Sequence, residues 1–239
     1  MNIRVFPDQY GAAIYAAATI ETTVKTSTSP VLGLATGGTM TPVYRQLVEF
    51  HRRGLHFSHV TTINLDEYVG LSPSHPNSYH AFMQENLFDH IDVNPDKIYL
   101  PSGDSEDLDG VCAKYDDVIR TNPIDLQLLG IGVNGHIGFN EPANSLKSNT
   151  HIVQLTEDTI RENARFFEDE KSVPTRAITV GLQSILLAKH ILLLAFGEKK
   201  AQAIRDTIKG DISTTVPSSF LQVHPNVTIV LDEAAAQLF

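Results

Sequence analysis

Short apolar runs alternate with longer amphipathic stretches along the chain. Runs such as Val31 to Ala35 and His190 to Phe196 have the length and flanks of buried strands. The stretches between them carry apolar residues at helical spacing, as in Phe82 to Phe88. This alternation predicts a single α/β domain with an open, mostly parallel sheet and helices on both faces. The predicted strands cover residues 1–6, 31–35, 60–65, 98–100, 151–155, 176–180, 190–196 and 227–231, with a central strand that starts at 124. The predicted helices cover residues 9–26, 41 to about 54, 78–91, 108–121, a stretch from 156, 181–187, 198–208 and 218–221.

Several helix starts carry recognisable capping residues. Asp8 and Thr156 precede helical patterns, and Thr41 is expected to cap a helix in which Pro42 takes the first turn. The helix predicted from residue 198 begins instead with Lys199 and Lys200, whose charges oppose the helix dipole. A bound anion would relieve this conflict. Two solvated lysines remain the alternative.

A polar loop, Thr36-Gly-Gly-Thr39, joins the strand at 31–35 to the next helix. Backbone N–H groups at such a junction bind anions, and two glycines allow a phosphate to approach closely. The loop matches neither a Walker motif nor the dinucleotide motif, and an ordinary turn is an equal alternative.

Two carboxylates, Asp66 and Glu67, follow the strand at 60–65 directly. Ligands of open α/β sheets bind at the carboxyl ends of strands, where a carboxylate can act as a base. The alternative is that the pair only caps the following turn.

The central strand ends in a loop with glycines at 130, 132, 135 and 138. This loop also contains His136 and Glu141. An imidazole exchanges protons near neutral pH, and a nearby carboxylate can orient it. A tight turn with a solvated histidine is the alternative.

Composition narrows the classes of function. The formal net charge of −10, with no basic block, excludes a nucleic-acid surface. The single cysteine, Cys112, excludes an intrachain disulfide and a cysteine metal cluster, which fits the cytoplasm. No leader is found and no stretch reaches about 18 apolar residues, so no membrane association is expected. With no nucleotide motif or metal triad, the expected chemistry is acid–base catalysis on a small phosphorylated substrate.

The same motifs closely resemble the glucosamine-6-phosphate deaminase family over nearly the whole chain. The resemblance rests on four segments, at residues 35–39 (ATGGT), 64–71 (NLDEYVGL), 135–142 (GHIGFNEP) and 164–167 (ARFF). It implies a Rossmann-like fold and the conversion of glucosamine 6-phosphate and water into fructose 6-phosphate and ammonia. No cofactor and no metal are implied.

By this resemblance, each site residue has an expected role. His136, supported by Glu141, would open the sugar ring, and Asp66 would move the proton from C2 to C1. The expected substrate and phosphate contacts are Thr36, Gly37, Gly38, Thr39, Glu67, Gly135, Arg165 and Lys200. A mobile lid is expected at about residues 157–174.

Two departures from the family pattern are visible. Asn134 stands where many members have aspartate, so an amide would orient the histidine without adding charge. His151 and Val153 stand where regulated, hexameric members bind an acetylated sugar phosphate through basic residues, and the long tail of those members is missing. We therefore expect an unregulated monomer or small homo-oligomer.

Two other functions compete with this interpretation. A sugar-phosphate lactonase of the same fold group would fit the Asp66-Glu67 pair and the 139–142 segment poorly. A sugar-sensing domain of a transcription regulator would need an attached helix-turn-helix, and the sequence starts with its first predicted strand.

Overall fold

A computed structural model describes residues 1–238, apart from the side chain of residue 170, and its centre is a seven-stranded parallel sheet. The strand order is β1-β10-β9-β6-β2-β3-β5. All six pairings are parallel, which confirms the predicted class of sheet. The strands are β1 (Asn2–Phe6), β2 (Val31–Leu34), β3 (Thr61–Asn64), β5 (Ile98–Tyr99), β6 (Leu126–Leu129), β9 (Ile191–Ala195) and β10 (Val227–Asp232).

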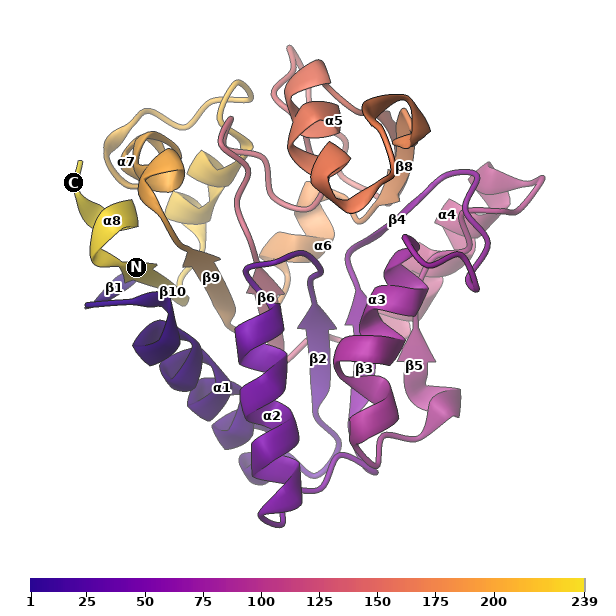
Figure 1. Cartoon of the computed structure of the whole chain (residues 1–239), viewed down its shortest axis with the longest axis vertical. Coiled ribbons are helices and arrows are strands. Elements are labelled where there is room, and N and C mark those ends of the chain that lie inside the picture. Colours follow the sequence, from indigo (N-terminus) through magenta and orange to yellow (C-terminus); the bar gives the residue numbers. More distant parts are fainter. Residues whose placement is uncertain (239) are drawn as a thin grey trace.

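Helices cover both faces of this sheet (Figure 1): α1, α2 and α3 lie on one face, and α4 and α6 on the other. This division follows from right-handed crossovers. From β1 through β2 and β3 the chain moves across the sheet toward β5, and from β5 through β6 and β9 it moves back toward β10, so the connecting helices change face. The direction therefore reverses between the adjacent strands β2 and β6, and ligands of open α/β sheets bind outside the carboxyl ends at such a reversal. The helices are α1 (Gln9–Thr26), α2 (Thr41–Arg52), α3 (Tyr79–Asn86), α4 (Leu108–Thr121), α5 (Glu157–Asn163), α6 (Leu182–Leu186), α7 (Ala201–Lys209) and α8 (Glu233–Ala236). Short 3-10 turns are η1 (Phe88–His90), η2 (Pro95–Lys97), η3 (Ala164–Phe166), η4 (Glu170–Ser172), η5 (Glu198–Lys200) and η6 (Pro217–Val223).

A second, three-stranded sheet lies above the carboxyl ends of the main sheet (Figure 1) and was not anticipated from the sequence. It consists of β4 (Asp66–Tyr68), β8 (Arg176–Thr179) and β7 (His151–Gln154), paired antiparallel in the order β4-β8-β7. The strands predicted at 151–155 and 176–180 exist, but they belong here and not to the main sheet. The outer strand β7 is only partly buried, whereas β8 between its two neighbours is mostly buried, as is typical of a small antiparallel sheet with an exposed edge.

Most helix boundaries match the sequence-based expectations, with three exceptions. Asp8 and Thr156 cap α1 and α5 as expected. Thr41 does not cap α2, because it is already the first helical residue after Met40. The helix expected over 78–91 breaks at Leu87, so that Ser78 caps a shorter α3. The two lysines expected inside the helix from residue 198 lie in the separate turn η5 before α7.

Alanine side chains set the packing of α1 against the rest of the molecule. Ala12, Ala13, Ala16 and Ala17 are completely buried. Small side chains allow a helix to approach its neighbours closely. Because its buried face is made largely of alanines, which are only mildly hydrophobic, α1 has a weak contrast between its buried and exposed faces. Among the described residues, no helix combines the length and apolarity needed to cross a bilayer.

Candidate active site

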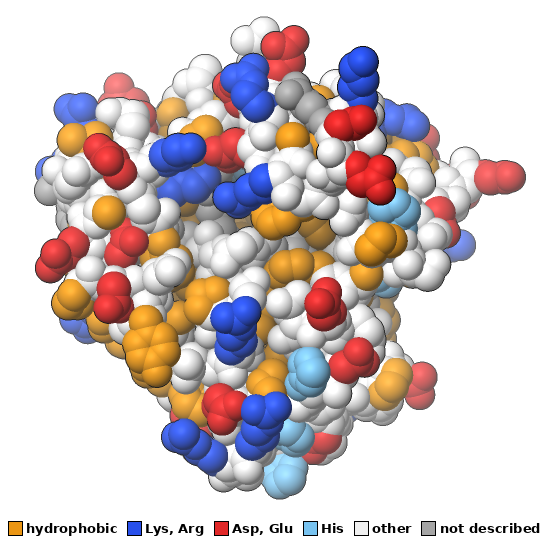
Figure 2. Space-filling model, viewed as in Figure 1, with side chains coloured by type: hydrophobic (Ala, Val, Ile, Leu, Met, Phe, Trp, Pro, Cys, Tyr) orange, Lys and Arg blue, Asp and Glu red, His pale blue; other side chains and the backbone are white. Residues whose placement is uncertain are grey.

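A cavity of about 150 Å³ lies at the carboxyl ends of β2 and β6, where the direction of the strand order reverses. It opens into an outer cleft of about 1120 Å³, with which it shares the 38–39 loop and the segment from Glu162 to Phe166. Figure 2 shows this face hollowed below the segment that carries α5, with Lys and Arg side chains at the rim. The cavity is lined by residues 35–40, Leu65, Asp66, Tyr79, Gly130, Ile131, Gly132, His136, Gly138, Phe139, Thr159, Glu162, Asn163, Arg165, Phe166 and Lys200.

Asp66 stands in the wall of this cavity on β4. Its pairing partner is Thr179 of β8, whose hydroxyl accepts the amide of Phe139 at 3.0 Å. Gly138 has a positive φ of 57°, and a Cβ there would lie 2.9 Å from the Thr179 hydroxyl, so only glycine fits between these strands. The Asp66 carboxyl is 6% exposed. Burial, with a smaller contribution from the neighbouring Glu67 carboxylate, raises the pKa of Asp66 to about 8.

His136 and Glu141 form a pair on the loop that follows β6. The Nδ1 of His136 lies 3.3 Å from Oε2 of Glu141. Because a carboxylate accepts, Nδ1 carries the proton, and Nε2 keeps a lone pair that can act as a base. Gly132 makes room for the ring, since a Cβ there would lie 2.5 Å from the imidazole Cε1.

The Glu141 carboxylate lies behind the imidazole and is held by three donors. Thr159 donates to Oε1 at 2.5 Å and the Asn134 amide donates to Oε2 at 2.8 Å, in addition to His136. Burial raises the pKa of Glu141, but these hydrogen bonds and the nearby imidazole outweigh it and hold the pKa below its usual value. Glu141 is therefore charged at neutral pH and can stabilise an imidazolium.

Asn134 orients the carboxylate rather than the imidazole ring. Its Oδ1 accepts the backbone N–H of His136 at 3.1 Å, while its Nδ2 binds Glu141. The amide thus fixes the loop that carries the histidine, and the charge in this part of the site comes from Glu141 alone.

The opposite side of the cavity is rich in donors. The loop Thr36-Gly-Gly-Thr39 lines it below, with Gly37 at a φ of 96°. Arg165 lies over this loop, because a Cβ added at Gly38 would be 4.0 Å from its Nη2. Lys200 reaches in from η5, where its Nζ lies 3.6 Å from the Glu162 carboxylate. Loop amides, a guanidinium and an ammonium together suit a phosphate group.

Burial lowers the pKa of Lys200, and the cations Arg165 and Lys199 act in the same direction, opposed by Glu162. Holding these cations close together in a partly buried site costs free energy, through desolvation and mutual repulsion. A bound anion would offset that cost.

Three cavity residues escaped the sequence analysis. Tyr79 follows the Ser78 cap and lines the cavity, and its hydroxyl donates to the Tyr68 hydroxyl at 3.4 Å. Thr159 and Glu162 lie on α5, which reaches the site only because β7 and β8 place it there. The one local signal was that Thr159 and Glu162 are three positions apart and so share a helix face.

Two expected contact residues are not brought to the cavity. Glu67 points away from it, and its carboxylate is used entirely within the protein, by amides of β4 and α3. Gly135 packs against Val216, and its carbonyl accepts the Ser218 amide at 2.9 Å. Neither lines the cavity or the outer cleft.

One group of side chains in residues 1–238 has metal-ligand character. His51, His56 and Asp92 bring ligand atoms within 4.8 Å of one another. They lie at the end of α2, and none of them lines the cavity or the outer cleft. Asp92 already accepts the Phe57 amide at 2.6 Å, so it holds the turn after α2.

Comparison with known proteins shows which family has this sequence. The sequence profile of the glucosamine-6-phosphate isomerase/6-phosphogluconolactonase family matches residues 10–230. The chain belongs to this family. Within the family, the glucosamine-6-phosphate deaminase of Thermoanaerobacter pseudethanolicus is 52% identical over 225 residues, covering 93% of this chain and 89% of that protein. Glucosamine-6-phosphate deaminase 1 of Bacillus subtilis is 49% identical over 218 residues, 90% of each chain.

Among solved structures, a deaminase is much more similar to this chain in sequence than a lactonase of the same fold. A monomeric glucosamine-6-phosphate deaminase is 45% identical and superposes with a TM-score of 0.98 over 100% of both chains. The 6-phosphogluconolactonase of Leishmania guyanensis has a TM-score of 0.78 at 20% identity, over 99% of this chain and 97% of that one, and so shares the fold. The similarity in sequence thus lies with the deaminase branch.

Proposed function

We propose that this protein converts glucosamine 6-phosphate and water into fructose 6-phosphate and ammonia. The observation that carries the proposal is one small cavity in which a buried carboxyl, Asp66, and His136, backed by Glu141, share the wall with the 36–39 loop, Arg165 and Lys200. The high identity to deaminases over nearly the full chain supports the same reaction. No cofactor is required for this chemistry, because each step moves a proton or exchanges ammonia for water.

His136 acts first, on the closed sugar ring. Its Nε2 accepts the proton of the C1 hydroxyl and returns it to the ring oxygen, which gives the open-chain aldehyde. The imidazolium that forms between these two transfers is stabilised by the Glu141 carboxylate at 3.3 Å. Thr159 and Asn134 hold this carboxylate in place, so that the ring stays in a productive orientation.

Asp66 then acts on the open chain. Its carboxylate takes the proton from C2 while the C2 ammonium gives a proton to the aldehyde oxygen, which leaves an enolamine. The Asp66 carboxyl then returns its proton to C1. The resulting iminium at C2 adds water and releases ammonia, giving the ketone of fructose 6-phosphate. The substrate reaches the enzyme with a charged amino group at C2. This cation would lower the raised pKa of the buried carboxyl and ionise the base in the complex.

The phosphate would bind at the donor-rich wall, against the 36–39 loop, Arg165 and Lys200. Arg165 belongs to the segment 157–174, which we propose as a lid over the substrate. Substrate phosphate would draw Arg165 and Lys200 together and displace the Glu162 carboxylate from Lys200, where it lies at 3.6 Å.

We further propose that the protein acts as a monomer in the cytoplasm. The similar solved deaminase is described as monomeric.

The test is a pair of assays on the purified protein. Glucosamine 6-phosphate should release ammonia and fructose 6-phosphate in equal amounts, while 6-phosphogluconolactone should be hydrolysed no faster than in buffer. Hydrolysis of the lactone without ammonia release from the amino sugar would overturn the proposal in favour of the lactonase branch of the family.

A further inference from the structure

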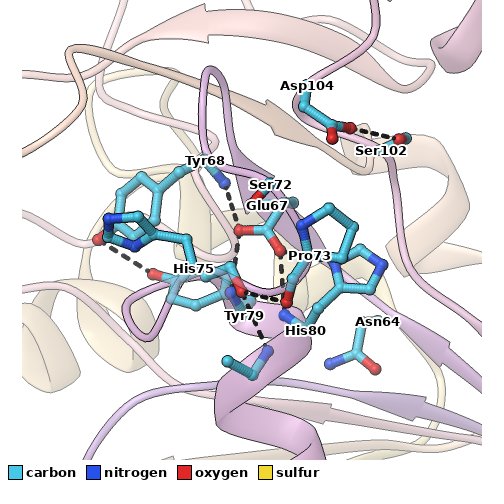
Figure 3. Close-up of polar contacts among 12 residues, drawn as sticks. Asn64, Glu67, Tyr68, Ser72, Pro73, His75, Tyr79, His80, Ser102 and Asp104 are labelled. Carbon is cyan, nitrogen blue, oxygen red and sulfur yellow. Dashed lines mark hydrogen bonds and ion pairs between the residues drawn. The ribbon is translucent and has the colours of Figure 1, made fainter.

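Glu67 is a buried carboxylate that points from β4 toward Tyr79 and His80 at the start of α3 (Figure 3). It is 1% exposed and accepts four hydrogen bonds. The amides of Tyr68 and Tyr79 donate to Oε1 at 2.8 and 2.9 Å, and the amide and Nδ1 of His80 donate to Oε2 at 3.0 and 2.8 Å. A carboxylate only accepts hydrogen bonds, and these four donors occupy both of its oxygens.

These bonds connect two residues of the cavity wall. Asp66 precedes Glu67 on β4, where successive side chains point to opposite faces, so Asp66 faces the cavity when Glu67 faces α3. Tyr79 lines the cavity from the first turn of α3, and Glu67 holds its amide. Glu67, which lies outside the cavity, therefore ties together two residues of its wall, Asp66 and Tyr79.

In addition to burial, the Glu67 carboxylate, which lies outside the cavity, raises the pKa of Asp66 through electrostatic repulsion. Other titratable groups also surround Asp66, and several of them are tyrosines. Tyrosines of four elements interact with the Asp66 charge: Tyr44 of α2, Tyr68 of β4, Tyr79 of α3 and Tyr115 of α4. Burial raises the pKa of each of these tyrosines far above the neutral range, so they are uncharged.

Charged and titratable groups also face Asp66 across the cavity. They are His136 of the loop after β6, Glu162 of α5, Arg165 of η3 and Lys200 of η5. His80 of α3 faces Glu67 itself, and its imidazole is 25% exposed. Beside burial, only Glu67 contributes to the raised pKa of Asp66.

We propose that Glu67 is a positioning residue for the Asp66 base: it fixes β4 against α3, and its carboxylate, next to Asp66 on the strand, makes Asp66 a stronger base. The inference rests on the proposed function. It predicts that Glu67 never contacts substrate and yet determines the pH at which the enzyme works. A negative charge beside a carboxyl makes its proton bind more tightly, and a base that binds protons more tightly takes the C2 proton faster once ionised.

The experiment is the pH profile of Glu67→Gln. Gln keeps the shape and can still accept the Tyr68 and Tyr79 amides at Oε1, while its NH2 can donate to Nδ1 of His80. The His80 amide, which donates to Oε2 at 3.0 Å, loses its acceptor, so a fall in kcat alone does not support the inference. The acid limb of kcat/KM for ammonia release should move to lower pH by roughly one unit, and the plateau of kcat should fall about tenfold. A purely structural role would lower kcat and leave the limb in place, and that result would overturn the inference.

Two variants serve as controls. Glu67→Asp keeps the charge, so its acid limb should stay within about 0.3 units of wild type even if its rate is lower. Asp92→Asn removes a carboxylate that likewise accepts an amide and an imidazole, but at the end of α2 outside the cavity, and its profile should match wild type. A limb that moves equally in Asp92→Asn would also overturn the inference.

A readout independent of turnover separates this inference from the proposed function. Carbon-13 NMR of carboxyl-labelled protein, with the Asp66 signal assigned by its loss in Asp66→Asn, follows that carboxyl directly. Its titration should move down in Glu67→Gln even if the protein released no ammonia. If Glu67→Gln does not fold, the wild type decides: a Glu67 carboxyl found protonated in the pH range where Asp66 titrates would contradict the inference.

Discussion

The Nζ of Lys200 lies 3.6 Å from the carboxylate of Glu162, inside a cavity whose other features suit an anion. Both side chains are largely buried, with 19% and 35% of their surface exposed. The carboxylate neutralises the lysine while the cavity is empty, and a substrate phosphate must displace it. Glu162 is thus an internal competitor for the anion.

Removing this competitor should strengthen phosphate binding. In Glu162→Gln, we expect the inhibition constant of inorganic phosphate and the KM for glucosamine 6-phosphate to fall about threefold to tenfold, because the repulsion between carboxylate and phosphate is lost. Asp158→Asn is the matched control, since Asp158 pairs with Arg161 at 3.3 Å with both side chains 64% exposed. Weaker phosphate binding in Glu162→Gln would mean that Glu162 positions Lys200 instead.

Asp66→Asn should abolish turnover while substrate still binds. The amide keeps the shape of the side chain and loses the base, and loss of a general base typically slows a reaction about 10² to 10⁴-fold. Exchange of the C2 proton with solvent deuterium reports this step directly, and a wild-type exchange rate in the variant would refute the assignment. Binding of an unreactive sugar phosphate, measured by calorimetry, shows that the site is otherwise intact.

The same substitution should stabilise the protein in alkaline solution. The pKa of Asp66 is raised from 3.8 to about 8 on folding, so the folded protein binds this proton more tightly than the unfolded chain. The associated stability is fully present below about pH 4 and is lost as the pH rises to about 8. Asn has no proton to lose. Asp66→Asn should therefore be close to wild type in unfolding free energy at pH 4 and more stable on the order of 2–5 kcal/mol at pH 9. Urea unfolding at the two pH values measures the difference, and an unchanged difference would contradict the raised pKa.

His136→Gln separates ring opening from the later proton transfer. We expect the rate with cyclic glucosamine 6-phosphate, and in reverse with cyclic fructose 6-phosphate, to fall about 10²-fold or more. An acyclic analogue should still bind, and its C2 proton should exchange at close to the wild-type rate, because Asp66 is untouched. Equal losses for the cyclic and acyclic compounds would remove ring opening as the specific role of His136.

Rates should be hyperbolic in substrate, and N-acetylglucosamine 6-phosphate should not activate. An anionic effector needs donors at a second site, and Val153 offers none. Burial lowers the pKa of His151, whose Nδ1 already donates to the Asn149 carbonyl at 2.8 Å, so this side chain is neutral at pH 7. Initial rates with and without the effector test this, and sigmoidal rates that become hyperbolic on its addition would show a regulatory site elsewhere.

The sequence predicted the main sheet well because its inner strands β2, β9 and β10 are mostly apolar runs with helical patterns before and after them. It also predicted that Asp66 and His136 converge, since both follow such runs and parallel strands end at one edge. It could not predict the second sheet. The strand β4 has only three residues, and its pairing with β8 depends on contacts between distant parts of the chain. For the same reason the residues that α5 brings to the cavity were missed.

The sequence also could not show in which direction each side chain points. Two adjacent carboxylates, Asp66 and Glu67, are chemically alike, and only the pleat of β4 shows that one faces the cavity and the other faces α3. The family resemblance separated their roles, but because no strand was expected there, the sequence offered no reason to point Glu67 away from the cavity.

The pairing of Asp66 with Thr179 also determines when the site can form during folding. Local contacts such as those between α1 and α2 close short loops, whereas β4 must wait for a strand near the other end of the chain. A nascent or refolding chain without β8 cannot position its catalytic base, however much helix it has already formed. Recovery of activity is therefore expected to follow the latest phase of refolding, well after circular dichroism shows native secondary structure.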